Sequence, residues 1–182
     1  LSTCGNAVLT ARLSWSTVVS TAVTALWESL EQVTDPEIPV ISVIELGIVR
    51  DIEIDAANNC IVTITPTYSG CPAMDVIAQE ITAALQNLGV NEVKIVHQLS
   101  PAWTTDWMKG SGKEKLREYG IAPPVQQVVD ISSLSRVSDP QIDCTHCGSK
   151  NTRLLSQFGS TSCKALYRCN DCLEPFDYFK AH

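Results

Sequence analysis

Apolar residues in the first part of the chain recur at intervals of three and four, which is the period of an amphipathic helix. This helix is predicted to run from Thr17 to about Val33. Its apolar face consists of Val18, Val19, Ala22, Val23, Leu26, Leu30 and Val33. Residues 1–16 have no firm period and are expected to form a loose lead-in. Pro36 prevents the helix from continuing, so residues 35–39 are expected to form an extended, stiff loop.

The pattern then changes to short runs that are typical of β-strands. Residues 49–54 and 60–65 flank a turn-rich connector at 55–59, and they are predicted to pair as a hairpin. Residues 90–99 are predicted to form a third strand, with Val93 and Ile95 on one face. Together these strands supply a small sheet.

Two more helices are expected beside this sheet. The first is predicted to open at Cys71-Pro72 and to end at Gly89. Its apolar positions keep the helical period: Met74, Ile77, Ile81, Ala84, Leu85 and Leu88. Residues 111–114, Ser-Gly-Lys-Glu, have the form of a capping box for a short helix that runs to Tyr119.

The order helix, strand, strand, helix, strand, helix predicts an α+β domain over residues 17–121, in which helices pack on a small sheet. Residues 122–142 are rich in Pro, Gln, Ser and Val without a clear period, and we interpret them as a linker. Residues 143–182 are predicted to form a C-terminal β zinc ribbon.

The ribbon prediction depends on two Cys-x-x-Cys pairs, Cys144 with Cys147 and Cys169 with Cys172. Each pair places two thiols on one tight turn, and two such turns give the closed tetrahedral set that structural zinc prefers. The 21 residues between the pairs match the usual spacing of a ribbon. An iron–sulfur cluster on the same ligands is the first alternative, and disulfide bonds are the second.

Two residues near the pairs have an ambiguous role. His146 lies inside the first turn and is expected to point to solvent or to support a ligand rather than to bind metal. Cys163 lies between two predicted ribbon strands. It suits a buried, small hydrophobic position, and an additional metal ligand is the alternative.

Charge narrows the classes of partner. Residues 1–121 carry 7 Lys and Arg against 14 Asp and Glu, and the rest of the chain carries 6 of each. Neither part suits a phosphate backbone, so a nucleic acid is not expected as a partner. No run of eighteen apolar residues occurs, so no membrane-spanning helix is predicted. Scattered cysteines and the absence of a signal-peptide pattern favour a reducing compartment, the cytoplasm.

Cys71 is the other residue with chemical promise. At the start of a helix, backbone N–H groups and the helix dipole favour the thiolate, the form that binds soft metals. The alternative is an N-cap with an inert, buried sulfur. Asp35 and Glu37 offer two carboxylates fixed around Pro36, although an exposed turn capped by Asp35 is the simpler interpretation.

Taken together, these residues resemble the metal–sulfur cluster assembly family over about residues 17–100. The segments that carry the resemblance are 34–39 (TDPEIP), 42–49 (SVIELGIV) and 65–72 (TPTYSGCP). A longer resemblance, from Thr17 onward, is to the family of phenylacetate-degradation D proteins. It is carried by residues 101–108 (PAWTTDWM), 116–121 (LREYGI), 158–161 (FGST), 163–169 (CKALYRC) and 174–180 (EPFDYFK).

The resemblance implies an accessory protein of the phenylacetyl-CoA epoxidase system, and not an enzyme. In that system the oxygenase carries a di-iron centre and the reductase carries flavin and an iron–sulfur cluster. Such a protein is expected to help assemble metal in these subunits, the flavoprotein reductase among them, and a homodimer is compatible with the family. Cys71 would hold iron or a cluster transiently, with Asp35 and Glu37 shaping its site. One departure is Ala181, which stands where such chains carry a cysteine.

The chain has neither a Glu-x-x-His helix for di-iron nor a Gly-x-Gly-x-x-Gly fingerprint for a dinucleotide, which fits a role without catalysis. A second hypothesis is a structural subunit that couples the oxygenase to the reductase without handling metal. A third, a ribbon that binds nucleic acid, conflicts with the charge distribution.

Overall fold

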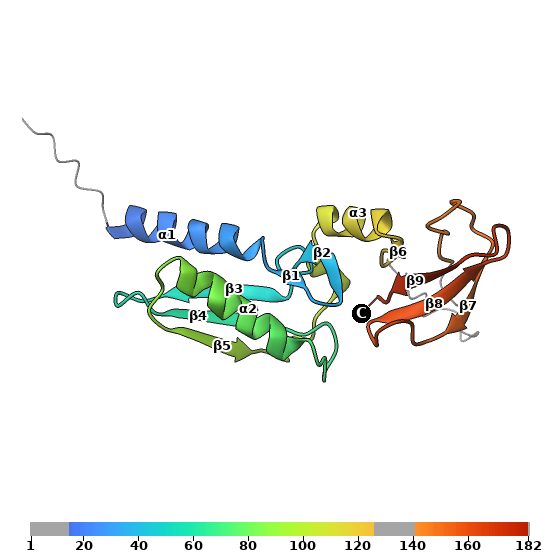
Figure 1. The fold of residues 1–182 in the computed structure, drawn as a ribbon. Coiled ribbons are helices and arrows are strands. Elements are labelled where there is room, and N and C mark those ends of the chain that lie inside the picture. Colours follow the sequence, from blue (N-terminus) through green and yellow to red (C-terminus); the bar gives the residue numbers. More distant parts are fainter. Residues whose placement is uncertain (1–14, 126–140, 182) are drawn as a thin grey trace, which may run out of the picture.

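The computed structural model describes residues 15–125 and 141–181 of the chain. It confirms the predicted class, an α+β domain followed by a β ribbon (Figure 1). The predicted lead-in, residues 1–16, lies outside the described residues except at its last two positions, and so does most of the predicted linker, 122–142. The division of the chain at these boundaries stays a prediction. Within the described ranges, no helix is long and apolar enough to cross a membrane.

A three-stranded sheet forms the centre of the first part. Strands β3 (Val49–Ile54) and β4 (Cys60–Ile64) pair as the predicted antiparallel hairpin, and β5 (Val93–His97) lies parallel to β4. Helix α2 (Met74–Asn87) makes the crossover between the two parallel strands, as parallel pairing requires. Helix α1 (Trp15–Leu30) packs against β3 and α2 (Figure 1).

The core lies between this sheet and the two helices. The predicted face of α2 is buried at Met74, Ile77, Ile81 and Leu85. The facing strand residues Cys60, Val62 and Ile64 alternate with more exposed neighbours, as expected for a strand with one buried face. Gly89 follows α2 with φ +87°, so the predicted end of that helix is confirmed.

The prediction of an extended loop at residues 35–39 is wrong. The chain forms a small antiparallel pair, β1 (Thr34–Asp35) with β2 (Ile38–Ser42), joined by a tight turn at Pro36-Glu37. The side chain of Asp35 stabilises this turn, because its Oδ1 accepts hydrogen bonds from the backbone N–H groups of Glu37 at 2.8 Å and Ile38 at 3.0 Å. Proline and aspartate favour such a turn, so local side-chain chemistry outweighed the extended interpretation.

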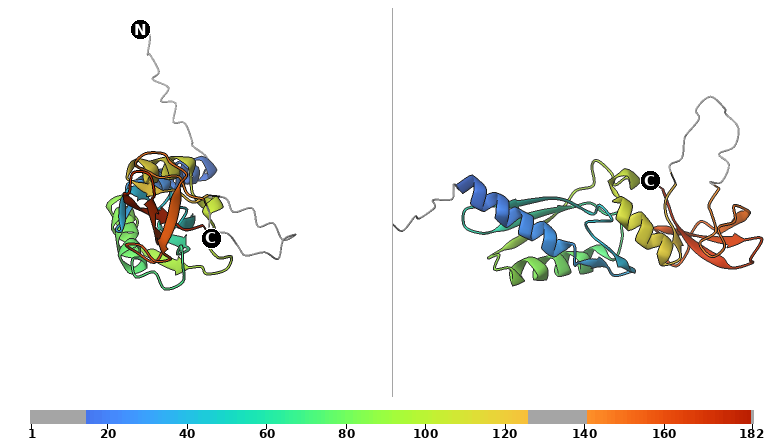
Figure 2. Two further views of the ribbon diagram at one scale, coloured as in Figure 1. Left: turned by 90° about the vertical axis from the view of Figure 1, so that its right-hand side faces the viewer. Right: turned by 90° about the horizontal axis from the view of Figure 1, so that it is seen from above.

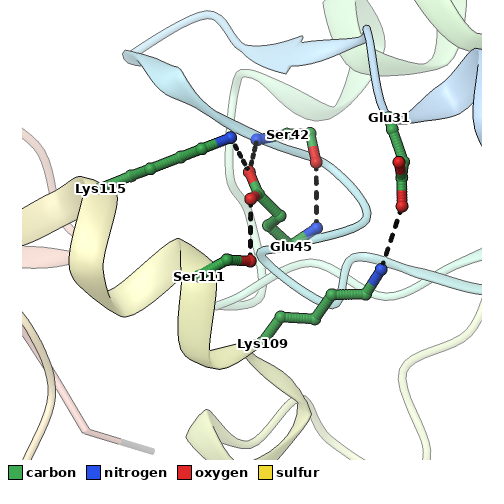
Figure 3. Close-up of polar contacts among 6 residues, drawn as sticks. All are labelled: Glu31, Ser42, Glu45, Lys109, Ser111 and Lys115. Carbon is green, nitrogen blue, oxygen red and sulfur yellow. Dashed lines mark hydrogen bonds and ion pairs between the residues drawn. The ribbon is translucent and has the colours of Figure 1, made fainter.

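Two predicted helix starts also differ from the structure. Helix α2 begins at Met74 with Ala73 as its N-cap, so Cys71 lies three residues before the helix and does not cap it. Helix α3 (Gly110–Glu118) has no side-chain cap at Lys109, and the predicted capping box is absent. Ser111 donates its hydroxyl to Glu45 Oε1 at 2.9 Å instead, because α3 packs on the turn that contains Glu45 (Figure 3).

Glu45 is the polar centre of that packing. Its Oε2 accepts from the N–H of Ser42 at 3.1 Å, and its own N–H donates to Ser42 Oγ at 3.1 Å. Lys115 of α3 donates to the same carboxylate at 2.8 Å, while Lys109 pairs with Glu31 at 3.3 Å on the surface (Figure 3). A capping box therefore exists, but it lies in the turn at 42–47 and attaches α3 to the first part of the chain.

The C-terminal part is a four-stranded sheet in the order β6-β9-β8-β7. Strands β7 (Thr152–Ser156), β8 (Lys164–Cys169) and β9 (Pro175–Phe179) lie within a few residues of the predicted ribbon strands. Strand β6 (Ile121–Ala122) comes from the end of the first part and pairs in parallel with β9. Figures 1 and 2 show the two parts end to end, with α3 at their junction.

The two parts share a core at this junction. Phe179 of β9 is 1% exposed and belongs to the hydrophobic cluster of the first part, together with Cys163. Its ring meets that of Trp103 edge to face, with 6.0 Å between the centroids. The indole N–H of Trp103 donates to the carbonyl of Leu46 at 3.0 Å, which links the ribbon contact to the 42–47 turn.

Candidate metal centre

The four cysteines of the two Cys-x-x-Cys pairs converge at one end of the ribbon. Cys144 and Cys147 lie on the turn before β7, where Gly148 has φ +72° and donates its N–H to the carbonyl of Cys144. Cys169 ends β8, and Cys172 lies on the turn before β9. The strand pairing of β8 with β7 and β9 therefore brings together turns that are far apart in the sequence.

The sulfur positions fit a single tetrahedral ion. All four Sγ atoms lie within 4.8 Å of one another, with 3.7 Å between Cys144 and Cys172 and 3.6 Å between Cys147 and Cys169. A tetrahedral ion with metal–sulfur bonds of about 2.3 Å spaces its ligands at about 3.8 Å. A multi-iron cluster would hold its ligands farther apart, because they bind different iron atoms. The four cysteines thus form a metal-binding group shaped for one ion.

Backbone N–H groups prepare these thiols for metal. The N–H of Cys172 and that of Asp171 lie 3.5 Å and 3.4 Å from Cys169 Sγ, and the N–H of His146 lies 3.4 Å from Cys144 Sγ. The hydrogen bond from the Cys172 backbone is the largest influence that lowers the pKa of Cys169, to about 6. Stabilising the thiolate favours metal binding, because the thiolate is the ligand form.

Sequence reasoning missed one supporting residue at this site. Asp171 accepts hydrogen bonds from the Ser149 hydroxyl and, at 2.7 Å, from the Asn151 side chain, and so joins the second cysteine turn to the residues after the first. The signal was its position between Cys169 and Cys172. His146 is exposed, in agreement with the expectation that it points to solvent.

Cys71 lies on a separate loop between β4 and α2, and it is half-buried. The prediction that its surroundings favour the thiolate is wrong. Burial is the main cause that raises the pKa of Cys71; the N–H of Ala73 lowers it, and the charge of Glu37 raises it again. The helix begins too late for its dipole to outweigh burial and nearby negative charge.

Asp35 and Glu37 lie close enough to Cys71 for both charges to raise the pKa of its thiol. Asp35 is 7% exposed and caps its own turn, so it is not the exposed residue of the simpler interpretation. Burial raises the pKa of Asp35, while hydrogen bonds from Glu37 and Ile38 and the charge of Lys164 lower it. The structure therefore groups the three predicted residues of this site, which are 34 residues apart or more between the loop and the turn.

Cys163 is not part of the four-cysteine group in the described residues. It is 5% exposed, and its Sγ lies 3.0 Å from the hydroxyl of Thr161. Burial raises the pKa of its thiol, and the charges of Glu37 and Asp35 also raise it. Sequence reasoning missed that the adjacent Lys164, 4% exposed, would be buried near Asp35.

Comparisons with known proteins agree with this division. Residues 24–97 match the family described as "Iron-sulfur cluster assembly protein", and residues 130–180 match "PaaD zinc beta ribbon domain". The chain is 46% identical over 165 residues to a protein of Escherichia coli (strain K12) whose name makes it a subunit of 1,2-phenylacetyl-CoA epoxidase. That match covers 91% of this chain and 96% of the relative.

The first part also has shorter relatives. It is 36% identical over 86 residues to "Fe-S protein maturation auxiliary factor YitW" of Bacillus subtilis (strain 168), covering 47% of this chain and 83% of the relative. A solved structure, a domain of unknown function (DUF59) from Bacillus anthracis, matches with 30% identity and a TM-score of 0.52. That match covers 56% of this chain and 96% of the solved one.

Proposed function

Because the chain belongs to the family of the Escherichia coli epoxidase protein, in which an iron–sulfur cluster assembly domain precedes a PaaD zinc ribbon, we propose that it is a maturation factor for a phenylacetyl-CoA epoxidase. It helps assemble an iron–sulfur or other metal centre in the reductase or oxygenase subunits. It does not catalyse the oxygenation itself.

The observation that carries the proposal is the separation of two thiol sites with different character. The ribbon cysteines form a closed set for one ion, which suits a resident structural zinc. Cys71 is half-buried on a loop with carboxylates beside it and belongs to no disulfide. A thiol that is protonated when empty and partly accessible suits a ligand that takes up and releases iron as cargo.

The ribbon has a different task in this proposal. Zinc on its four cysteines stabilises the small sheet and fixes β8 and β9 against the first part of the chain. Free thiols require a reducing compartment, so we place the protein in the cytoplasm. Its partners are the epoxidase subunits, with the iron–sulfur flavoprotein reductase as the first candidate for receiving cargo.

The test is the metal content of the reductase produced in cells that carry Cys71→Ser in place of the wild-type chain. We expect iron and acid-labile sulfide in the reductase to fall at least severalfold. Cys60→Ser is the matched control, because Cys60 is a buried thiol at the far end of β4 and is 1% exposed. Normal reductase metal with Cys71→Ser, together with loss of the epoxidase complex when the ribbon is deleted, would instead support a purely structural subunit.

A further inference from the structure

The ribbon reaches the Cys71 loop through one short segment, residues 161–164. Cys163 belongs to the hydrophobic cluster of the first part, and Tyr68 and Cys71 pack against the same cluster. The side chain of Ser162 hydrogen-bonds with Tyr68, which also hydrogen-bonds with Cys71. The segment before β8 therefore lies against the 68–71 loop and not only against its own sheet.

The charged groups of this region confirm that placement. The charges of Asp35 and Glu37 act on both Cys71 and Cys163, so the two thiols share the same two carboxylate neighbours. Lys164, which is almost fully buried, acts on Asp35 and lies 3.9 Å from Asp177 Oδ2. A buried ammonium beside two carboxylates partly balances their charge.

We propose that Cys163 is a second thiol ligand of the Cys71 site, so that iron cargo is held between the assembly domain and the ribbon. This inference rests on the proposed function, because it assigns a ribbon residue to the site where cargo is handled. Soft thiolates with one or two carboxylates suit ferrous iron or an iron–sulfur cluster. Each thiol that binds releases its proton to solvent.

The backbone around Cys163 is fixed in place for such a role. The carbonyl of Cys163 accepts from the N–H of Lys180 at 3.0 Å, and Gly159 donates its N–H to the carbonyl of Lys164 at 2.8 Å. In the described ranges, the ribbon cysteines are the group of three or more ligands whose atoms lie within 4.8 Å of one another. The ligands around Cys71 are thus near one another without being closed, which fits cargo that enters and leaves.

The experiment adds ferrous iron, without sulfide and without oxygen, to the full chain loaded with zinc. Bound iron and zinc per chain are measured after gel filtration for the wild type, Cys163→Ser, Cys163→Ala and Cys71→Ser. Cys60→Ala is the control for loss of a buried thiol elsewhere in the same core. We expect both Cys163 variants to weaken iron binding at least about tenfold, the scale that loss of even an outer-shell partner costs, with zinc unchanged.

Iron binding equal to the wild type in Cys163→Ala, with zinc retained, would overturn the inference. If both Cys163 variants lose zinc or fail to fold, iron K-edge X-ray absorption of the wild type decides: two protein sulfurs on iron support the inference and one overturns it. A wild type that binds no iron also overturns it. Reductase metal that does not depend on Cys71 defeats the proposed function, whereas iron that depends on Cys71 and not on Cys163 defeats this inference alone.

Discussion

At the scale of single residues, Glu45 has the densest set of polar contacts in the first part of the chain (Figure 3). Glu45→Ala leaves the buried N–H of Ser42 without its acceptor and removes the partner of Lys115. We expect a loss of about 1–3 kcal/mol in the free energy of unfolding, measured in urea. Lys109→Ala is the control: it breaks an ion pair whose side chains are 50% and 52% exposed, and should cost well under about 1 kcal/mol.

The contribution of Glu45 should depend on pH. Burial tends to raise its pKa, but hydrogen bonds from Lys115, Ser42 and Ser111 bring the pKa of Glu45 below its ordinary value of 4.5. The folded chain therefore binds this proton less tightly than the unfolded chain. Its stabilisation is fully present above pH 4.5 and is lost as pH falls through the lower, folded pKa. The stability difference between wild type and Glu45→Gln should shrink accordingly, and a difference that grows on acidification would contradict this assignment.

The residue scale also shows what the sequence could predict about the sites. The four ribbon cysteines were predictable because Cys-x-x-Cys geometry is local. The surroundings of Cys71 were not, because its pKa is decided by burial and by charges from a turn more than thirty residues earlier. The place of Lys164 was hidden for the same reason, since lysine is rarely buried and its carboxylate neighbours come from two different sheets.

At the scale of elements, the contact between α3 and the 42–47 turn can be tested at a glycine. A Cβ at Gly112 would lie 2.9 Å from Ile41 Cδ1 and 3.2 Å from the carbonyl oxygen of Glu45. Gly112→Ala should therefore destabilise the fold by about 1–3 kcal/mol, as overpacking does. Gly110→Ala, in the same helix with no atom within 4 Å of its Cβ, should be neutral or slightly stabilising. Equal unfolding midpoints for the two variants would contradict this packing.

Strands and the long helix were more predictable than short connections. The hairpin β3–β4 and the buried face of α2 follow directly from hydrophobic period. The starts of α2 and α3 and the turn at Pro36 were mistaken, because a side chain from elsewhere or a neighbouring carboxylate decides each of them. The pairing of β6 with β9 could not be read from a two-residue strand.

At the scale of the whole molecule, two ribbon phenylalanines separate contact with the first part from ribbon surface. Phe179 is 1% exposed and packs on Trp103, whereas Phe158 is 67% exposed. Phe179→Ala should lower the free energy of unfolding of the full chain by about 3–5 kcal/mol, and Phe158→Ala by less than about 0.5 kcal/mol. An unfolding transition of the first part that is unchanged by Phe179→Ala would mean that the ribbon does not support it.

The central claim is that one chain carries two thiol sites, a ribbon that retains a structural ion and a Cys71 site that holds iron as cargo. The most direct measurement is the zinc and iron content of the full chain after exposure to ferrous iron without oxygen, for wild type and Cys71→Ser. The account predicts about one zinc per chain in both proteins, the stoichiometry of one tetrahedral site, and iron in the wild type alone. Iron in place of zinc on the ribbon, or equal iron in both proteins, would contradict it.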